Sequence, residues 1–214
     1  MIEHKTVSLA DQVFEHLETD ILSGKYQRGE ILTESKLSLE LGVSRTPIRE
    51  ALRRLEQEHI IEESGKGAVV LGITEKDVDD IFVIRRQLES LAVDLAIDKC
   101  TDEELEKLKE IVELQEFYME KGDPEKIKQM DNQFHALIYS ICDSVIFYDI
   151  LIPLHKKIQK YRKNAVKSSS RAHASVEEHR KIFNAIAARD KALAEKYILE
   201  HVDNAYNHIR RKDA

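Results

Sequence analysis

The chain has 214 residues with 42% hydrophobic side chains, 34% charged side chains and a formal net charge of −7, which is typical of a globular protein with one or two domains. No segment approaches the roughly 18 uninterrupted apolar residues of a membrane span, and residues 1–9 lack the pattern of a secretory signal. We therefore expect a cytoplasmic protein with no membrane partner, in which the widely separated Cys100 and Cys142 are buried thiols.

The first predicted elements are three helices. Apolar residues at helical spacing predict a helix over 7–23, which Gly24 ends. After a turn-rich connector, Thr33 is placed to cap a short helix that ends at Gly42. Ser44 is then the expected cap of the third helix. Two short helices joined by a tight glycine turn are the sequence form of a helix-turn-helix.

After His59 the pattern changes from helical to extended. Residues 60–63 and 68–71 are expected strands, joined by a glycine turn that contains Lys66 and Gly67. Such a hairpin would form a wing beside the helix-turn-helix.

The chain beyond the hairpin is expected to be helical throughout. We place the boundary at 72–74, which gives a winged helix-turn-helix domain over 1–72 and a second domain over 75–214. Amphipathic patterns in the second domain predict helices at 75–99, 101–121, 124–142, 145–164, 174–189 and 190–211. Their short connections indicate an antiparallel all-helical bundle, so the fold is expected to be mainly α. The serines of 167–171 indicate a flexible loop.

The start of the third helix carries the strongest functional signal. Although the chain is acidic, this helix concentrates basic residues: Arg45, Arg49, Arg53 and Arg54, opposed only by Glu50. The first turns of the second helix of a helix-turn-helix enter the major groove of DNA, where arginine can donate to guanine. The hydroxyls of Ser44 and Thr46 suit phosphate oxygens. An ordinary solvated helix face is the alternative interpretation of such a cluster.

Residues 7–72 resemble the winged helix of the GntR family of regulators. The resemblance rests on the run Leu41-Gly-Val-Ser-Arg-Thr-Pro-Ile-Arg-Glu-Ala-Leu52 and on Ile21-Leu-x-Gly-x-Tyr-x-x-Gly29 upstream of it. It implies a set of DNA contacts, which would be Ser44, Arg45, Thr46 and Arg49, with Lys66 and Gly67 of the wing beside them. Two positions depart from the family: His59 replaces a glycine that usually ends the helix, and Ser35 replaces an arginine contact of some relatives.

A second constellation combines one aspartate with three histidines on apolar helix faces. Asp131 and His135 are four residues apart and so lie on one helix face, while His179 and His201 lie on the apolar stripes of two later helices. If they converge in the bundle, these side chains suit a divalent transition metal. The alternative is that each is an ordinary core residue. The other histidines, His155 among them, show no comparable pattern.

Residues 75–211 resemble the FCD domain of the FadR subfamily of GntR regulators. The segments Asp131-Asn-Gln-Phe-His135 and Glu178-His179-Arg-x-Ile182, followed by His201, match the ligand pattern of its metal-binding members. The resemblance implies a metal centre that helps to hold a small carboxylate effector. Zinc is the first candidate, and nickel, manganese and iron accept the same ligands.

Arg85 is the candidate that would bind the carboxylate of the effector. It shares a helical row with Val78 and Ile81 and therefore faces the core, whereas Arg86 is rotated toward solvent. Two interpretations stay open, a buried ion pair with Glu89 or a contact with the effector. The resemblance favours the effector, because the subfamily often places an arginine four residues before this glutamate.

Together these features predict a ligand-responsive regulator that binds a roughly palindromic DNA operator as a homodimer. A metal-dependent hydrolase is an alternative of another class, but no pattern such as His-Glu-x-x-His supplies a general base, and an enzyme would leave the first seventy or so residues unexplained. A regulator with a purely structural metal is a third hypothesis.

Overall fold

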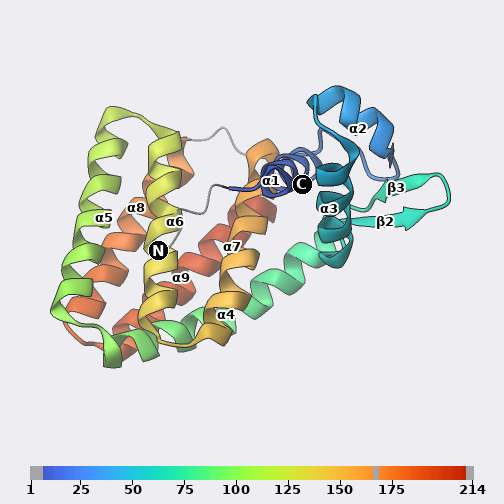
Figure 1. The fold of residues 1–214 in the computed structure, drawn as a ribbon. Helices are drawn as coiled ribbons and strands as arrows, with labels where there is room; N and C mark the ends of the chain where they lie inside the picture. Colours follow the sequence, from blue (N-terminus) through green and yellow to red (C-terminus); the bar gives the residue numbers. More distant parts are fainter. Residues whose placement is uncertain (1–6, 166–168, 211–214) are drawn as a thin grey trace, which may run out of the picture. The chain divides into compact units, whose positions relative to one another are not determined.

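The structure is a computed structural model that describes residues 7–165 and 169–210 (Figure 1). Its N-terminal part contains α1 (Leu9–Leu22), β1 (Ile31–Leu32), α2 (Glu34–Leu41), α3 (Arg45–Gln57), β2 (Ile61–Ser64) and β3 (Gly67–Val70). The remainder contains α4 (Glu75–Lys99), α5 (Asp102–Lys121), α6 (Pro124–Ile141), α7 (Val145–Ala165), α8 (Ser169–Ala187) and α9 (Lys191–Arg210). The mainly α fold that the sequence predicts is confirmed. None of the described helices is long and apolar enough to cross a membrane.

The chain divides into two compact units, each with its own hydrophobic core. The first unit comprises Met1–Glu75 together with Lys160–Asn164, and the second comprises Lys76–Gln159 together with Ala165–Ala214. A short stretch of α7 therefore groups with the first unit, which no sequence pattern indicates.

In the first unit, capping residues define the helix-turn-helix. The hydroxyl of Thr33 accepts a hydrogen bond from the backbone N–H of Lys36 at 3.2 Å, as expected of an N-cap. Gly42 ends α2 in the left-handed conformation, with φ of 66°, and thereby turns the chain into α3. Ser44 occupies the N-cap position of α3, but its hydroxyl makes no capping hydrogen bond. Ile48 on α3 is fully buried against the core of this unit.

The wing is a three-stranded antiparallel sheet rather than a simple hairpin. The order is β1–β3–β2, and β1, which the sequence did not indicate, pairs Ile31 with Val69. Gly67 is required where β1 and β3 meet, because a Cβ atom there would lie 2.6 Å from the backbone oxygen of Leu32. His59 has φ of 57°, so the chain enters the wing through a left-handed residue even without glycine.

The second unit is a bundle of the helices α4 to α9, apart from residues 160–164 of α7. Within it, α5 packs against α6 and α8, and α8 packs against α9. The predicted bounds hold within a few residues except at α8, which begins at Ser169 and not at 174. The expected loop over 167–171 is therefore wrong for its last three residues, and 167 and 168 lie outside the described residues. Arg171 is buried and donates two hydrogen bonds to Glu178, seven residues later on the same helix, and this contact favours the longer helix.

Candidate metal centre and nucleic-acid interface

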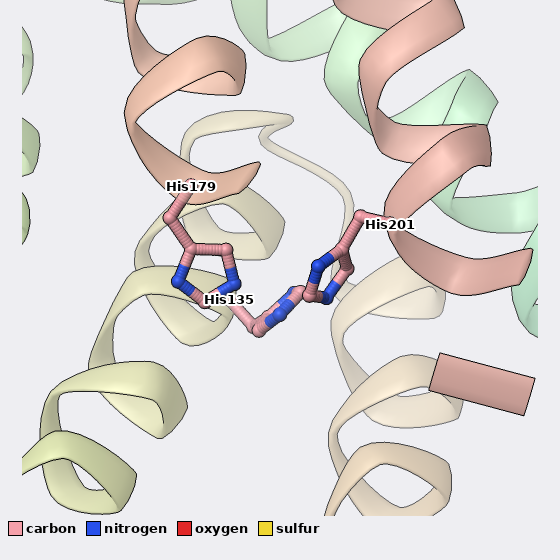
Figure 2. A group of neighbouring side chains, drawn as sticks. All are labelled: His135, His179 and His201. Carbon is pink, nitrogen blue, oxygen red and sulfur yellow. The ribbon is translucent and has the colours of Figure 1, made fainter. Parts of the chain in front are cut away.

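Three of the predicted metal ligands lie together inside the second unit. His135 on α6, His179 on α8 and His201 on α9 point toward one another (Figure 2). All three are buried, and each offers a ring nitrogen within 4.8 Å of the nitrogens of the other two. Residues that are far apart in the sequence thus form one cluster of imidazoles.

In two of these imidazoles, Nδ1 makes a hydrogen bond with a neighbouring polar side chain. Nδ1 of His179 lies 2.8 Å from Oε1 of Gln115, a fully buried residue of α5. Nδ1 of His201 lies 2.7 Å from Oε2 of Glu178. Because each oxygen accepts a hydrogen bond, Nδ1 of each ring carries the proton and Nε2 keeps its lone pair. This is the arrangement that orients histidines which bind metals.

The third imidazole, that of His135, has a different environment. Its Nδ1 lies 3.3 Å from the hydroxyl of Tyr139 and 3.6 Å from Oε2 of Glu89. Its Nε2 is buried and has no hydrogen-bond partner among the described residues. Burial, followed by the neighbouring His155, holds the pKa of His135 well below the usual histidine value, so the ring is neutral at pH 7.

Asp131 adds a carboxylate to the cluster. Its Oδ1 lies 3.7 Å from Nε2 of His179, and its Oδ2 lies 2.5 Å from the side-chain nitrogen of Gln159 and 3.3 Å from Nε2 of His155. Burial opposes the ionisation of Asp131, but the hydrogen bond from His155 helps to outweigh it and to keep the pKa well below the ordinary aspartate value. The carboxylate is therefore charged at pH 7.

The donor set fits a divalent metal ion. Nε2 of His179 is buried without a partner among the described residues, and it faces Oδ1 of Asp131, which is also an acceptor. Burial lowers the pKa of His179 to about 4 and that of His201 to well below the usual value, so both rings are neutral at pH 7 and Nε2 of each carries no proton. Lone pairs that converge without a donor are costly unless a cation lies between them. Neutral imidazoles and a carboxylate are suitable ligands for zinc and similar ions.

His155 on α7 is the residue that the sequence analysis missed. It is 4% exposed, and it forms a second possible ligand group with Asp131 and His135. The interpretation of His155 as a residue without any comparable pattern is therefore wrong. The available signal was the spacing of Leu151, His155 and Ile158, all three of which are buried on one face of α7.

Arg85 is buried next to this cluster and is paired within its own helix. Its Nε donates to Oε1 of Glu89 at 2.6 Å, and both side chains are almost fully enclosed. The structure thus has the ion pair between Arg85 and Glu89. The other oxygen of this carboxylate, Oε2 of Glu89, has no hydrogen-bond partner among the described residues. Arg86 is exposed and pairs with Asp203, in agreement with its predicted orientation.

The predicted DNA contacts lie on the exposed side of the first unit. Ser44, Arg45, Thr46 and Arg49 are all exposed at the start of α3. The opposite face of α3 is buried through Ile48, Ala51 and Leu55. Lys66 is exposed and Gly67 is half-buried at the turn between β2 and β3. Such a helix presents its first turn to a partner, as insertion into a major groove requires.

Comparison with known proteins agrees with this architecture. Residues 9–70 match the family described as bacterial regulatory proteins, gntR family, and residues 80–204 match the FCD domain. The chain is 31% identical over 201 residues to the HTH-type transcriptional regulator YdhC of Bacillus subtilis, which covers 93% of this chain and 90% of the relative. It is 28% identical over 198 residues to a gluconate operon transcriptional repressor of Bacillus licheniformis, covering 88% and 80%.

A solved structure is similar over the whole chain. The structure of Escherichia coli McbR/YncC has 26% identity and a TM-score of 0.79, and the match covers 98% of this chain and 100% of that one. These relatives carry names of transcription regulators and not of enzymes.

Proposed function

Because this chain belongs to the GntR family of bacterial transcription regulators and carries an FCD domain, we propose that its DNA binding responds to a small carboxylate effector at a metal centre. The observation that carries this proposal is the convergence of three buried imidazoles beside the carboxylate of Asp131, where Nε2 of His135 and Nε2 of His179 have no hydrogen-bond partner among the described residues. A purely apolar core would not need these groups, and a bound cation satisfies all of them at once.

The metal would be bound by Asp131, His135, His179 and His201. Zinc is the best match, because it takes imidazole and carboxylate ligands, while nickel, manganese and iron remain alternatives. When bound, the ion supplies positive charge to which the carboxylate of an effector is attracted. The protein itself contributes the orientation of the rings, through side chains such as Gln115 and Glu178.

The effector is proposed to be a small organic acid. Arg85 is the candidate for its carboxylate, and binding would require this guanidinium to share or leave its contact with Glu89. One relative is named for the gluconate operon, so sugar acids are the first candidates to test.

DNA binding would use the exposed start of α3 and the wing. We propose that Arg45 and Arg49 reach base edges in the major groove, and that Ser44 and Thr46 bind phosphates. Lys66 and Gly67 would lie beside the same DNA segment. The exposure of Ser44, Arg45, Thr46 and Arg49 at the start of α3 supports the proposal.

The regulator is proposed to act as a homodimer, and this rests on apolar side chains in the second unit. Val83 and Leu91 on α4 are 64% and 53% exposed, and Val145 and Ile146 on α7 are 72% and 68% exposed. Exposed apolar residues in such number favour contact with a partner. A two-fold dimer would recognise a roughly palindromic operator, since each copy presents one α3 helix.

The test is a DNA-binding measurement on the purified full chain. An operator would be selected from a random library, and its affinity measured by fluorescence anisotropy with and without zinc and sugar acids. Replacing Arg45 by alanine should weaken operator binding by roughly 10- to 100-fold, the loss expected for one good contact with a base. Arg53→Ala removes the same charge from an exposed position of α3 and serves as the control. Equal affinities of the two variants would contradict the proposal.

A further inference from the structure

Two side chains of α7 approach the same oxygen of Asp131. Oδ2 of this carboxylate lies 2.5 Å from Nε2 of Gln159 and 3.3 Å from Nε2 of His155. The two residues are four apart in the sequence and therefore lie on one face of α7. No metal-ligand pattern in the sequence includes either of them.

The position of the proton on His155 follows from its neighbours. Nε2 of His155 lies between two acceptors, Oδ1 of Asn132 at 3.1 Å and Oδ2 of Asp131 at 3.3 Å. A nitrogen between two acceptors carries the hydrogen, and it then has no lone pair to offer to a metal. Nε2 of His155 therefore acts as a donor, unlike the Nε2 atoms of His179 and His201.

The two oxygens of Asp131 consequently have different environments. Oδ2 accepts the donors from α7, whereas Oδ1 faces Nε2 of His179 at 3.7 Å and accepts one hydrogen bond, from the hydroxyl of Ser175 at 3.4 Å. Two ligands bound tetrahedrally to one zinc ion at about 2.0–2.1 Å are roughly 3.4 Å apart. The separation between Oδ1 and His179 is close to this value, so a small movement would bring both atoms onto one ion.

We propose that His155 and Gln159 are positioning residues which hold Oδ2 of Asp131, so that a metal is bound through Oδ1 alone. This inference rests on the metal centre of the proposed function and adds two residues of α7 to it. The hydrogen bonds fix the rotation of the carboxylate before the ion arrives, which lowers the cost of binding. They also leave one oxygen, rather than two, available to the ion.

The experiment measures zinc affinity of the full chain by competition with a chromophoric chelator. His155→Leu and Gln159→Leu each remove one donor to Oδ2 and should weaken zinc binding by roughly 10- to 100-fold. His155→Gln keeps an N–H group at a similar reach and should restore most of the affinity. Asn132→Ala removes the competing acceptor and should leave the affinity unchanged. Circular dichroism of each variant checks that the helical fold is retained.

X-ray absorption of the zinc-loaded proteins separates a positioning role from a ligand role. We expect the same number of imidazoles, three, in the wild-type protein and in all four variants. Four imidazoles in the wild type that fall to three in His155→Gln would overturn the inference, because His155 would then be a ligand. Unchanged affinity in His155→Leu and Gln159→Leu would overturn it as well. If the wild type itself bound no zinc, the proposed metal centre would fail, and this inference with it.

Discussion

Arg49 on α3 donates two hydrogen bonds to the carboxylate of Glu34 on α2, from Nε at 2.8 Å and from Nη2 at 2.9 Å. The pair fixes the plane of the guanidinium and leaves Nη1 without a role in this contact. The hydrogen bond from Arg49 lowers the pKa of Glu34, so the carboxylate stays charged well below neutral pH. An arginine that is already oriented loses less conformational freedom when it binds DNA.

Replacing Glu34 by alanine should therefore reduce the discrimination between operator and scrambled DNA by several-fold. Arg49 would lose its orientation, while the loss of a negative charge would strengthen non-specific binding. Fluorescence anisotropy at two salt concentrations measures both affinities. Glu50→Ala removes an exposed carboxylate of α3 and is the matched control. A similar change in both variants would show that only net charge matters.

The metal centre predicts which histidines control metal content. His135→Ala and His179→Ala should each lower the zinc that remains after dialysis, because each removes a buried nitrogen from the cluster. His173→Ala, at an exposed position of the same helix as His179, should keep the wild-type content. Elemental analysis of the purified proteins gives the result, and equal zinc in all of them would remove the site.

The neutral histidines predict that the metal-free protein loses stability in mild acid. The pKa of His179 is about 4 in the folded chain, against about 6.5 when the chain is unfolded. Between these values the unfolded chain binds a proton that the folded chain does not, so stability falls as the pH drops from 6.5 toward 4. The whole pKa difference of His179 between the folded and unfolded chain corresponds to about 3 kcal/mol in the free energy of unfolding.

Urea unfolding in the presence of a chelator, at pH 7.5 and at pH 5, measures this effect. His179→Gln removes the titrating group, and its stability should change less between the two pH values. A wild-type protein that is equally stable at both would show that these rings are not buried in neutral form.

The left-handed residue at the entry to the wing predicts a stabilising substitution. His59 is exposed with φ of 57°, a conformation that costs about 1–2 kcal/mol for a residue with a Cβ atom. His59→Gly should raise the free energy of unfolding, by up to about 1 kcal/mol after the entropy lost by glycine. Chemical denaturation measures the change.

Arg189 provides a contrast at nearly the same φ of 56°. Its guanidinium donates to the backbone oxygens of Ile97 and Cys100, at 2.5 and 2.6 Å, and so binds the carbonyls near the end of α4. Arg189→Gly should therefore destabilise the protein although it relieves the same backbone strain. A gain of stability in both variants would mean that these hydrogen bonds contribute little.

Most helices could be predicted from the sequence because their signals are local. Thr101 and Asp123 cap α5 and α6 through their own side chains, and Gly122 ends α5 with φ of 66°. These residues act within one helical turn, so their effect does not depend on the rest of the fold. The exposure of Arg45 and Arg49 could be predicted for a similar reason, since Ile48 fixes the buried face of α3.

What could not be predicted depends on contacts between distant parts of the chain. The strand β1 has only two residues and is defined by the pairing of Ile31 with Val69. The spacing of Leu151, His155 and Ile158 indicates a buried face of α7, but only the fold places His155 against Asp131. No local pattern marks Gln115 and Glu178. Only the packing of the bundle brings them within hydrogen-bond distance of Nδ1 of His179 and His201.

The candidate ligands come from α6, α8 and α9, so an ion held by them would join three separate segments of the chain. A bound zinc ion would then act as a reversible cross-link between these segments. Free zinc at 100 times its dissociation constant would stabilise the folded protein by about 2.7 kcal/mol. In a cell starved of the metal, more chains would be open to proteases at any moment. The amount of this regulator, and not only its affinity for DNA, would follow the supply of the ion.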